Sequence, residues 1–205
     1  MADIAPLIQR VLKTAHGFTD IQRASEEVFT SQSAAEVAGT ARELFACEVP
    51  QARMLATFLF GRLAAASKET LGFLRGQVSR DPDWRVQEIL AQAFDRYCRD
   101  TGYETALPVI KDWLLDPNPN VRRAVTEGLR IWTSRPYFRE RPEIATSLLS
   151  QLRADQSEYV RKAVGNALRD ISRKHGELVG TELQGWDLTD KRVSQTPRLA
   201  SRFLA

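Results

Sequence analysis

One helical pattern recurs three times in this chain, and that recurrence limits the folds it can adopt more than any other feature. Each copy has an amphipathic segment, an acid-bearing turn, and a second helix that opens on valine followed by a polar residue. A period of 30 to 50 residues with this layout is typical of HEAT-type repeats. The aligned valines, spaced by 35 and 39 residues, are Val86, Val121 and Val160, and the turn acids are Asp81, Asp116 and Asp155.

The apolar positions explain why such units must stack. The second helix of the middle copy carries one stripe at i, i+3, i+4, i+7 and i+11, formed by Val121, Ala124, Val125, Gly128 and Trp132. An isolated unit cannot bury this stripe, and its small residues let neighbouring helices approach closely. We therefore predict an all-α fold, a right-handed α-solenoid of HEAT-like helical repeats whose second helices line the inner surface.

Helical periodicity covers most of the chain, whereas strand patterns are weak. We place the solenoid at residues 1–185 and expect residues 186–205 to form a C-terminal tail or short docking helix that packs through Leu199, Phe203 and Leu204. The expected helices are 3–15, 18–29, 33–46, 50–65, 68–80, 84–99, 102–115, 119–134, 142–153, 157–173 and 176–184.

Composition and cysteine use exclude several classes of protein. The 205 residues are 43% hydrophobic and 27% charged, as in ordinary soluble globular proteins. No apolar run reaches the ~20 residues of a membrane-spanning helix, and the N-terminus lacks a signal-peptide pattern, so we expect a cytoplasmic monomer without a membrane partner. Neither the cysteines nor the histidines have metal-ligand spacing, so we predict no disulfide framework, no metal site and no cofactor; they are Cys47, Cys98, His16 and His175.

Positive charge is concentrated in the second half of the chain. Residues 1–100 hold 12 Lys and Arg against 13 Asp and Glu, whereas residues 118–175 hold 12 against 6. A basic region of this kind is the usual footprint of a polyanionic partner. A well-solvated helical surface explains the charge equally well, so position must decide between the two.

The polar faces of the second helices suggest a groove for such a partner. Residues at i, i+4 and i+7 share a helical face, so Arg123, Glu127 and Arg130 project together, and Lys162 and Arg169 do so one repeat later. Stacked repeats would align these faces, and the cations along them could track a phosphate backbone. The predicted DNA-binding residues are Arg123, Arg130, Lys162 and Arg169, with Arg122, Arg161 and Arg173 at the edges.

Two kinds of residue in this groove have alternative interpretations. Glu88 and Glu127 would repel a phosphate backbone, so Glu127 is either an ordinary ion-pair partner of a nearby arginine or a chemical group, and spacing alone favours the ion pair. Trp84 lies at a helix start and is either a lid on the groove or a packing residue. Trp132 continues the apolar stripe and fits the core.

Two stretches, DPNPNVRRAVTEGLR and YVRKAVGNALRDISRKH, resemble the HEAT-like repeat DNA glycosylases of the AlkC and AlkD type, and AlkC most of all. The DPNP turn, the paired arginines and Glu127-Gly128 occur in the order found in that family, and the similarity covers residues 80–178. The resemblance implies a DNA glycosylase that binds duplex DNA and excises cationic alkylated bases such as 3-methyladenine by hydrolysing the N-glycosidic bond.

The resemblance also implies roles for particular residues. The acids that match the family pattern are expected to be catalytic, Arg123 matches a DNA contact, and two aromatics are expected to contact the lesion. A methylated purine is a good leaving group, so a carboxylate mainly has to stabilise the oxocarbenium-like sugar and orient water. Two alternatives stay open: a catalytically inactive DNA-binding paralogue, and a HEAT scaffold that binds an acidic protein segment. The expected catalytic acids are Glu88, Glu127 and Asp170, and the lesion contacts are Trp84 and Trp132.

Overall fold

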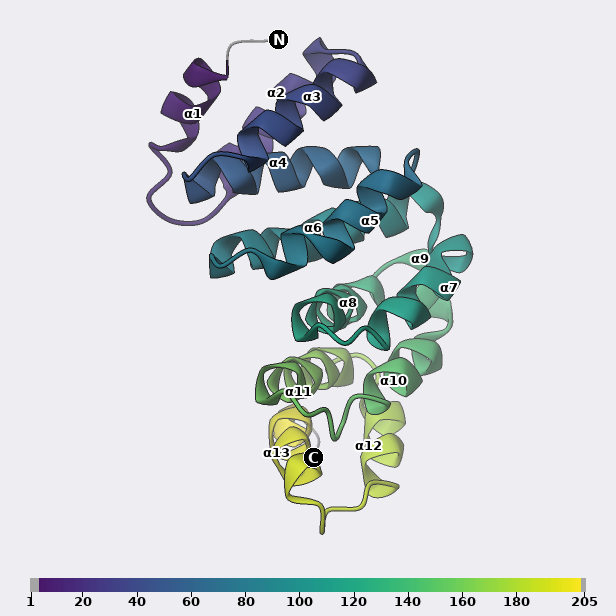
Figure 1. Ribbon diagram of the computed structural model, residues 1–205. Coiled ribbons are helices and arrows are strands. Elements are labelled where there is room, and N and C mark those ends of the chain that lie inside the picture. Colours follow the sequence, from purple (N-terminus) through teal and green to yellow (C-terminus); the bar gives the residue numbers. More distant parts are fainter. Residues whose placement is uncertain (1–3, 204–205) are drawn as a thin grey trace. The chain divides into compact units, whose positions relative to one another are not determined.

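The computed structural model describes residues 4–203, apart from the side chain of Gln195, and no strand occurs in that range. The chain forms two compact units, residues 1–101 and residues 102–205 (Figure 1). Within each unit, helices pack side by side in pairs. The predicted all-α fold of HEAT-like helical repeats is therefore confirmed.

Unit 1, residues 1–101, is built around one central helix, α4. Helix α4 contacts α1, α2, α3, α5 and α6, and most of its side chains are buried, so it has no broad polar face. It crosses α6 closely, because a Cβ placed on Gly61 would lie only 2.7 Å from the Cα of Ala93. The elements of unit 1 are α1 (Ala5–Val11), α2 (Thr19–Ser31), α3 (Ala34–Phe45), α4 (Pro50–Leu63), α5 (Lys68–Gly76), the 3-10 turn η1 (Val78–Arg80) and α6 (Trp84–Thr101).

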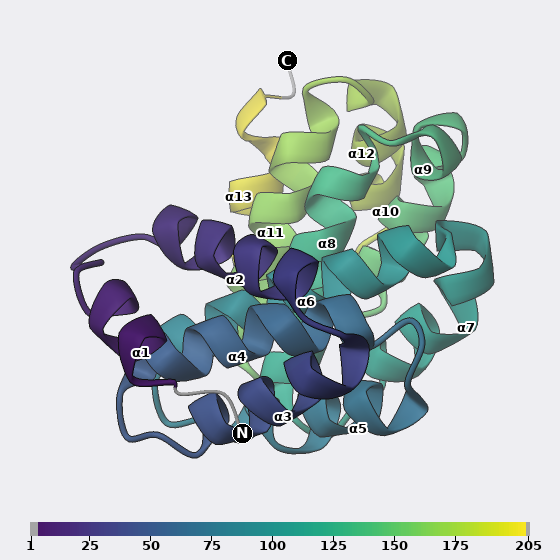
Figure 2. The same ribbon diagram turned by 90° about the horizontal axis from the view of Figure 1, so that it is seen from above.

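Unit 2, residues 102–205, arranges its helices in two layers. Helices α8, α11 and α13 follow one another in one layer, and α7, α10 and α12 lie in the other (Figures 1 and 2). The elements are α7 (Tyr103–Leu114), α8 (Pro119–Trp132), α9 (Pro136–Glu140), α10 (Pro142–Ser150), α11 (Glu158–Ser172), α12 (Gly176–Gln184), α13 (Lys191–Ala200) and the 3-10 turn η2 (Ser201–Phe203).

The three valines that align in the sequence repeats occupy equivalent buried positions in the structure. Val86, Val121 and Val160 are completely buried, each in the first turns of a second helix. Ala52 in α4 is also completely buried and lies 34 residues before Val86, so α4 is a further second helix that the sequence pattern did not reveal. Its near-continuous apolar sequence hides the helical period on which such patterns depend.

The last described residues form a helix seated on α11. In α13, Thr196 and Ala200 are buried, and a Cβ on Gly165 of α11 would lie 2.9 Å from the Cβ of Leu199. Leu199 therefore packs as expected, whereas Phe203 is 46% exposed. Leu204, the third residue expected to dock, lies outside the described residues. None of the helices in the described range is long and apolar enough to cross a membrane.

Candidate nucleic-acid interface

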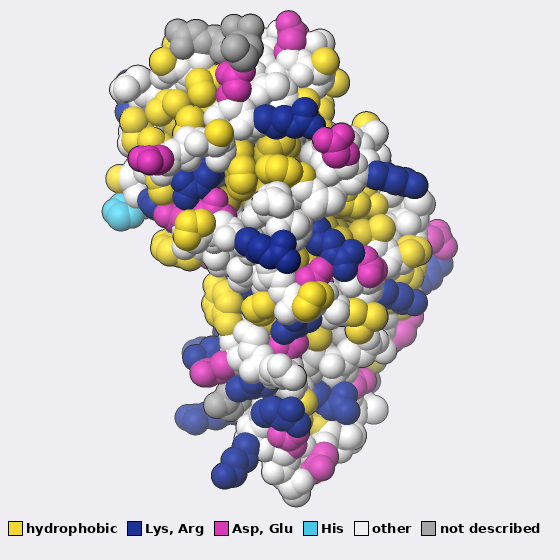
Figure 3. Space-filling model, viewed as in Figure 1, with side chains coloured by type: hydrophobic (Ala, Val, Ile, Leu, Met, Phe, Trp, Pro, Cys, Tyr) yellow, Lys and Arg dark blue, Asp and Glu magenta, His cyan; other side chains and the backbone are white. Residues whose placement is uncertain are grey.

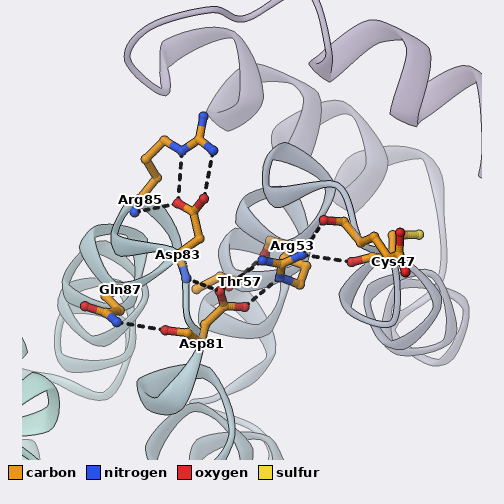
Figure 4. A network of polar contacts seen from close by, with 8 residues as sticks. Cys47, Arg53, Thr57, Asp81, Asp83, Arg85 and Gln87 are labelled. Carbon is orange, nitrogen blue, oxygen red and sulfur yellow. Dashed lines mark hydrogen bonds and ion pairs between the residues drawn. The ribbon is translucent and has the colours of Figure 1, made fainter.

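A network of ion pairs and hydrogen bonds fixes the start of α6 in unit 1 (Figure 4). Arg53 of α4 donates to both carboxylate oxygens of Asp81, at 2.7 and 3.1 Å. Asp81 in turn accepts from the backbone N–H of Asp83, and its carbonyl accepts from the Gln87 amide at 2.7 Å. Arg85 closes the turn by donating twice to the Asp83 carboxylate, which holds the pKa of Asp83 below its usual value despite partial burial.

This network orients two of the predicted site residues. Trp84 and Glu88 are four residues apart on α6, so their side chains lie on the same face of the helix. Both line a pocket of about 270 Å³ that lies wholly within unit 1. The remaining walls come from the α1–α2 loop, α4 and neighbouring positions of α6, namely Thr14, Ala15, His16, Gly17, Phe18, Gln51, Met54, Arg85 and Ile89.

The pocket combines an exposed aromatic ring with a carboxylate. Trp84 is 62% exposed, the accessibility expected of a contact residue and not of a core residue, and Glu88 is half-buried. The face of an indole ring and a carboxylate both attract a planar cation. Trp84 therefore lines a pocket and is largely exposed, which does not fit the packing interpretation, and its role as a lid on the groove stays a prediction.

Two arginines of the predicted DNA-binding set belong to the fold. Arg122 donates to both carboxylate oxygens of Asp155 at 2.7 Å, and its third nitrogen donates to the carbonyls of Asp116 and Pro117. Only 13% of the Arg122 side chain and 6% of the Asp155 side chain are exposed. Arg161 likewise donates to the carbonyl of Asp155 at 2.6 Å. These guanidinium groups hold the turns before α8 and α11, so Arg122 and Arg161 have a structural role in the repeats, and their contact with DNA stays a prediction.

The predicted acids of unit 2 form an ion-pair cluster with two arginines. Arg130 of α8 donates to Asp170 of α11 at 2.6 Å and to Glu127 at 3.1 Å, and Arg169 approaches Asp170 at 3.1 Å. The cluster therefore bridges α8 and α11 and contains equal numbers of positive and negative groups. The pairing of Glu127 with Arg130 is the ion-pair interpretation that the helical spacing favoured.

Asp170 stays ionised in this cluster. Burial raises its pKa, but hydrogen bonds from Arg169 and Arg130 outweigh that effect, and the net pKa lies below the usual value for aspartate. A carboxyl group with a depressed pKa cannot hold a proton to donate near pH 7. Asp170 can act electrostatically, although the adjacent arginines offset much of its field.

Three further cations of the predicted set remain accessible. The Arg123 guanidinium lies 4.5 Å from the centre of the Tyr159 ring, which is 48% exposed. Lys162 pairs with Glu158 at 2.7 Å, and both side chains are more than half exposed, so solvent screens the pair. Arg173 lies over the Phe203 ring at 4.5 Å. Lys162 can therefore exchange its exposed ion pair for a phosphate contact at low cost.

Trp132, one of the two predicted lesion contacts, is a core residue. Its side chain is completely buried, and its ring stacks on Phe138 with centroids 5.6 Å apart and lies 5.4 Å from Tyr103. Gly128 makes room for it, because a Cβ there would lie 2.3 Å from Cζ2 of Trp132. Lesion contact by Trp132 is therefore corrected to core packing, which its place on the apolar stripe already indicated.

Sequence reasoning missed the Arg53–Asp81 pair and the residues that complete the pocket around Glu88. Arg53 stands one residue after Ala52, as Arg122 stands after Val121, so extending the repeat register toward the N-terminus would have found it. The α1–α2 loop gave no comparable signal, because a loop has no period.

Within the part of the chain that the structure describes, no three His, Cys, Asp or Glu residues gather as a metal site.

This chain is similar to known proteins over most of its length. The family model described as DNA alkylation repair enzyme matches residues 16–202. The crystal structure of AlkD2 from Streptococcus mutans is similar, with 46% sequence identity, a TM-score of 0.95, and coverage of 98% of this chain and 97% of that chain.

Two further similarities are more partial. The Pseudomonas fluorescens alkylpurine DNA glycosylase AlkC, solved bound to DNA containing an abasic site analog, is 29% identical with a TM-score of 0.51. That match covers 97% of this chain but only 60% of the AlkC chain. The protein YhaZ of Bacillus subtilis (strain 168) is 37% identical over 78 residues, which are 36% of this chain and 22% of YhaZ.

Proposed function

We propose, from the premise that this chain belongs to the DNA alkylation repair enzyme family, that it binds duplex DNA and hydrolyses the N-glycosidic bond of cationic alkylated bases such as 3-methyladenine. The observation that carries the proposal is that exposed Trp84 and half-buried Glu88 line one pocket of unit 1. The AlkC similarity supports a DNA partner, because that glycosylase was solved on DNA.

Excision of a cationic base mainly requires a negative charge close to the sugar. When the C1′–N bond of a cationic base breaks, the bonding electrons neutralise the base and the sugar becomes an oxocarbenium-like cation. Water then adds to C1′ and gives up a proton. In the proposed mechanism the Glu88 carboxylate stabilises the developing sugar cation, orients that water and accepts its proton, while the Trp84 ring attracts the cationic base.

Of the three predicted acids, we propose Glu88 as the catalytic one. Glu127 and Asp170 pair with Arg130 and Arg169, which offset their fields at a distance, whereas Glu88 lines the pocket together with exposed Trp84. The proposed phosphate contacts are Arg123 and Lys162, with Arg173 at the C-terminal cap of the helix that carries Lys162. Lys162 pairs with an exposed glutamate, so solvent screens that ion pair, and Arg123 and Arg173 each lie over an aromatic ring.

The test is release of methylated bases from alkylated duplex DNA by the purified full chain and by Glu88→Gln. Removing one preorganised electrostatic group typically lowers a catalytic rate by about 10² to 10³, so we expect a loss of that order. DNA affinity is expected to stay within about twofold of the original. Glu177→Gln, a charge-matched change at an exposed position of α12, is the control and is expected to leave release unchanged.

A second candidate is DNA binding without base excision. The specific observation in its favour is the ion-pair cluster around Arg130. In this cluster Glu127 and Asp170, the two predicted catalytic acids of unit 2, both pair with Arg130. Intact DNA binding with no base release by the unmodified chain would establish this second function. Failure to bind duplex DNA even at low salt would exclude both.

A further inference from the structure

Helix α13 carries a basic stripe on the face opposite its packing surface. Its packing face is fixed by close contacts with α11, where the Thr196 carbonyl lies 3.1 Å from the position of a Cβ on Gly165. The Thr196 hydroxyl also donates to the carbonyl of Arg153 at 3.4 Å. Val193 and Ala200 are buried on this side. Because α13 is seated in this way, the direction of its other face is determined.

The opposite face of α13 carries one basic residue near each end of the helix. Lys191 and Arg198 are seven residues apart, which places them within about 20° of each other around the helix and about 10 Å apart along it. Val193 lies about 200° around the helix from Lys191. Arg202 follows in η2, and all three basic side chains are exposed. Residues 191–203 contain four Lys and Arg and no acidic residue.

The acidic residue directly before the stripe, Asp190, already has a partner. Asp190 caps α13 by accepting from the backbone N–H of Arg192, and it pairs with the Arg192 side chain at 2.7 Å. Hydrogen bonds from Arg192 lower the pKa of Asp190 to about 2. Asp190 is therefore matched by Arg192, and no ion pair joins Lys191, Arg198 or Arg202 to any acid among residues 4–203.

Arg173 adds a fourth cation at the C-terminal end of the stripe. It lies at the end of α11, and its guanidinium rests on the Phe203 ring of η2 at 4.5 Å. This contact links the basic end of α11 to the basic face of α13. Figure 3 shows several Lys and Arg side chains gathered over this end of unit 2.

Helix stability alone does not explain the stripe. Positive side chains near a helix C-terminus complement the helix dipole, which accounts for Arg198 and Arg202. Lys191 occupies the first position of α13, where the dipole disfavours a positive charge. A function that needs positive charge along the whole face accounts for all three residues.

We propose that the face formed by Lys191, Arg198 and Arg202, with Arg173 beside it, binds the phosphate backbone of duplex DNA. This surface is additional to the second-helix face of Arg123 and Lys162. The proposal rests on DNA binding as part of the proposed function, but it does not require base excision. One strand of duplex DNA carries a phosphate about every 3.4 Å along the duplex axis, so with α13 aligned to that axis Lys191 and Arg198 would span about three nucleotide steps.

Salt dependence of binding to undamaged duplex DNA tests the proposal. Each phosphate contact with B-DNA contributes about 0.9 to the slope of log affinity against log salt concentration. Replacing Lys191, Arg198 and Arg202 by glutamine in the full chain is expected to make the slope less steep by about 2.7, and each single substitution by about 0.9. Fluorescence anisotropy of a labelled duplex between 50 and 200 mM salt measures these slopes.

The control removes the same charge elsewhere on the surface, through Lys68→Gln, Lys111→Gln and Arg139→Gln at exposed positions of α5, α7 and α9. A change of slope in the α13 variant but not in the control supports the proposal. Equal changes in both show a general charge effect and overturn it, as does an unchanged slope in the α13 variant. If the unmodified chain does not bind the duplex at all, the proposed function has failed, and this surface has no DNA to contact.

Discussion

Replacing Arg122 by alanine tests whether this arginine holds the repeat together. The side chain joins the turn before α8 to the turn before α11 through the Asp155 carboxylate. It was expected from the sequence to contact DNA. The structure instead predicts that its loss lowers the stability of unit 2.

The size of the effect follows from what the change leaves behind. Arg122→Ala removes two hydrogen bonds to Asp155 and two to the carbonyls of Asp116 and Pro117, and it takes away the cation that pairs with Asp155, whose side chain is only 6% exposed in the intact protein. Breaking a buried ion pair by removing one partner costs about 3 to 5 kcal/mol. The remaining hydrogen bond from the Ser157 backbone to Asp155 offsets a small part of this cost.

Urea denaturation followed by circular dichroism measures the change. A domain of this size typically has an m-value of about 2 kcal/mol per molar urea, so a loss of about 4 kcal/mol moves the unfolding midpoint of unit 2 down by about 2 M. Arg123→Ala is the matched control, since it removes the neighbouring arginine from the same helix. That guanidinium stacks on exposed Tyr159, a contact worth about 0.5 to 1 kcal/mol.

The two variants are also expected to differ in DNA binding. Arg123→Ala should weaken binding and cost less stability than Arg122→Ala, because the Asp155 carboxylate beside Arg122 is far more buried than the Tyr159 ring beside Arg123. If Arg122→Ala were as stable as Arg123→Ala and bound DNA more weakly, the assignment of Arg122 to the fold would be wrong. The original DNA-binding prediction would then stand.

Three further outcomes are expected. Gly128→Ala should destabilise the protein by about 1 to 3 kcal/mol in urea titration, because its Cβ would overlap Trp132, whereas Gly180→Ala in open space should be neutral or stabilising by up to about 1 kcal/mol. Trp132→Ala should cost about 3 to 5 kcal/mol and Trp84→Ala much less, since only the former is buried. Asp170→Asn should be less stable than the original at pH 7. The pKa of Asp170 in the folded protein lies below its ordinary value of 3.8, so the carboxylate stabilises the fold fully above pH 3.8. This stabilisation is lost as the pH falls through the lower folded-state pKa, so the stabilities of the two proteins should converge in acid.

The sequence was informative wherever the helical period was visible. The stripe from Val121 to Trp132 predicted both the repeat fold and the burial of Trp132, because one apolar face of a helix has to find a partner. The spacing of Glu127 and Arg130 likewise indicated an ion pair, which the structure contains. The period failed in α4, where nearly every position is buried and the contrast between faces disappears.

The four-residue spacing of Trp84 and Glu88 and the four basic residues of 191–203 can both be read from the sequence. Only the tertiary structure decided which charges are already matched. Arg122 and Arg123 are adjacent in the sequence, yet one faces a buried carboxylate 33 positions away and the other an exposed ring. The free energy of a charge depends on burial and on partners brought near by packing, and neither is written in the spacing of residues along one helix.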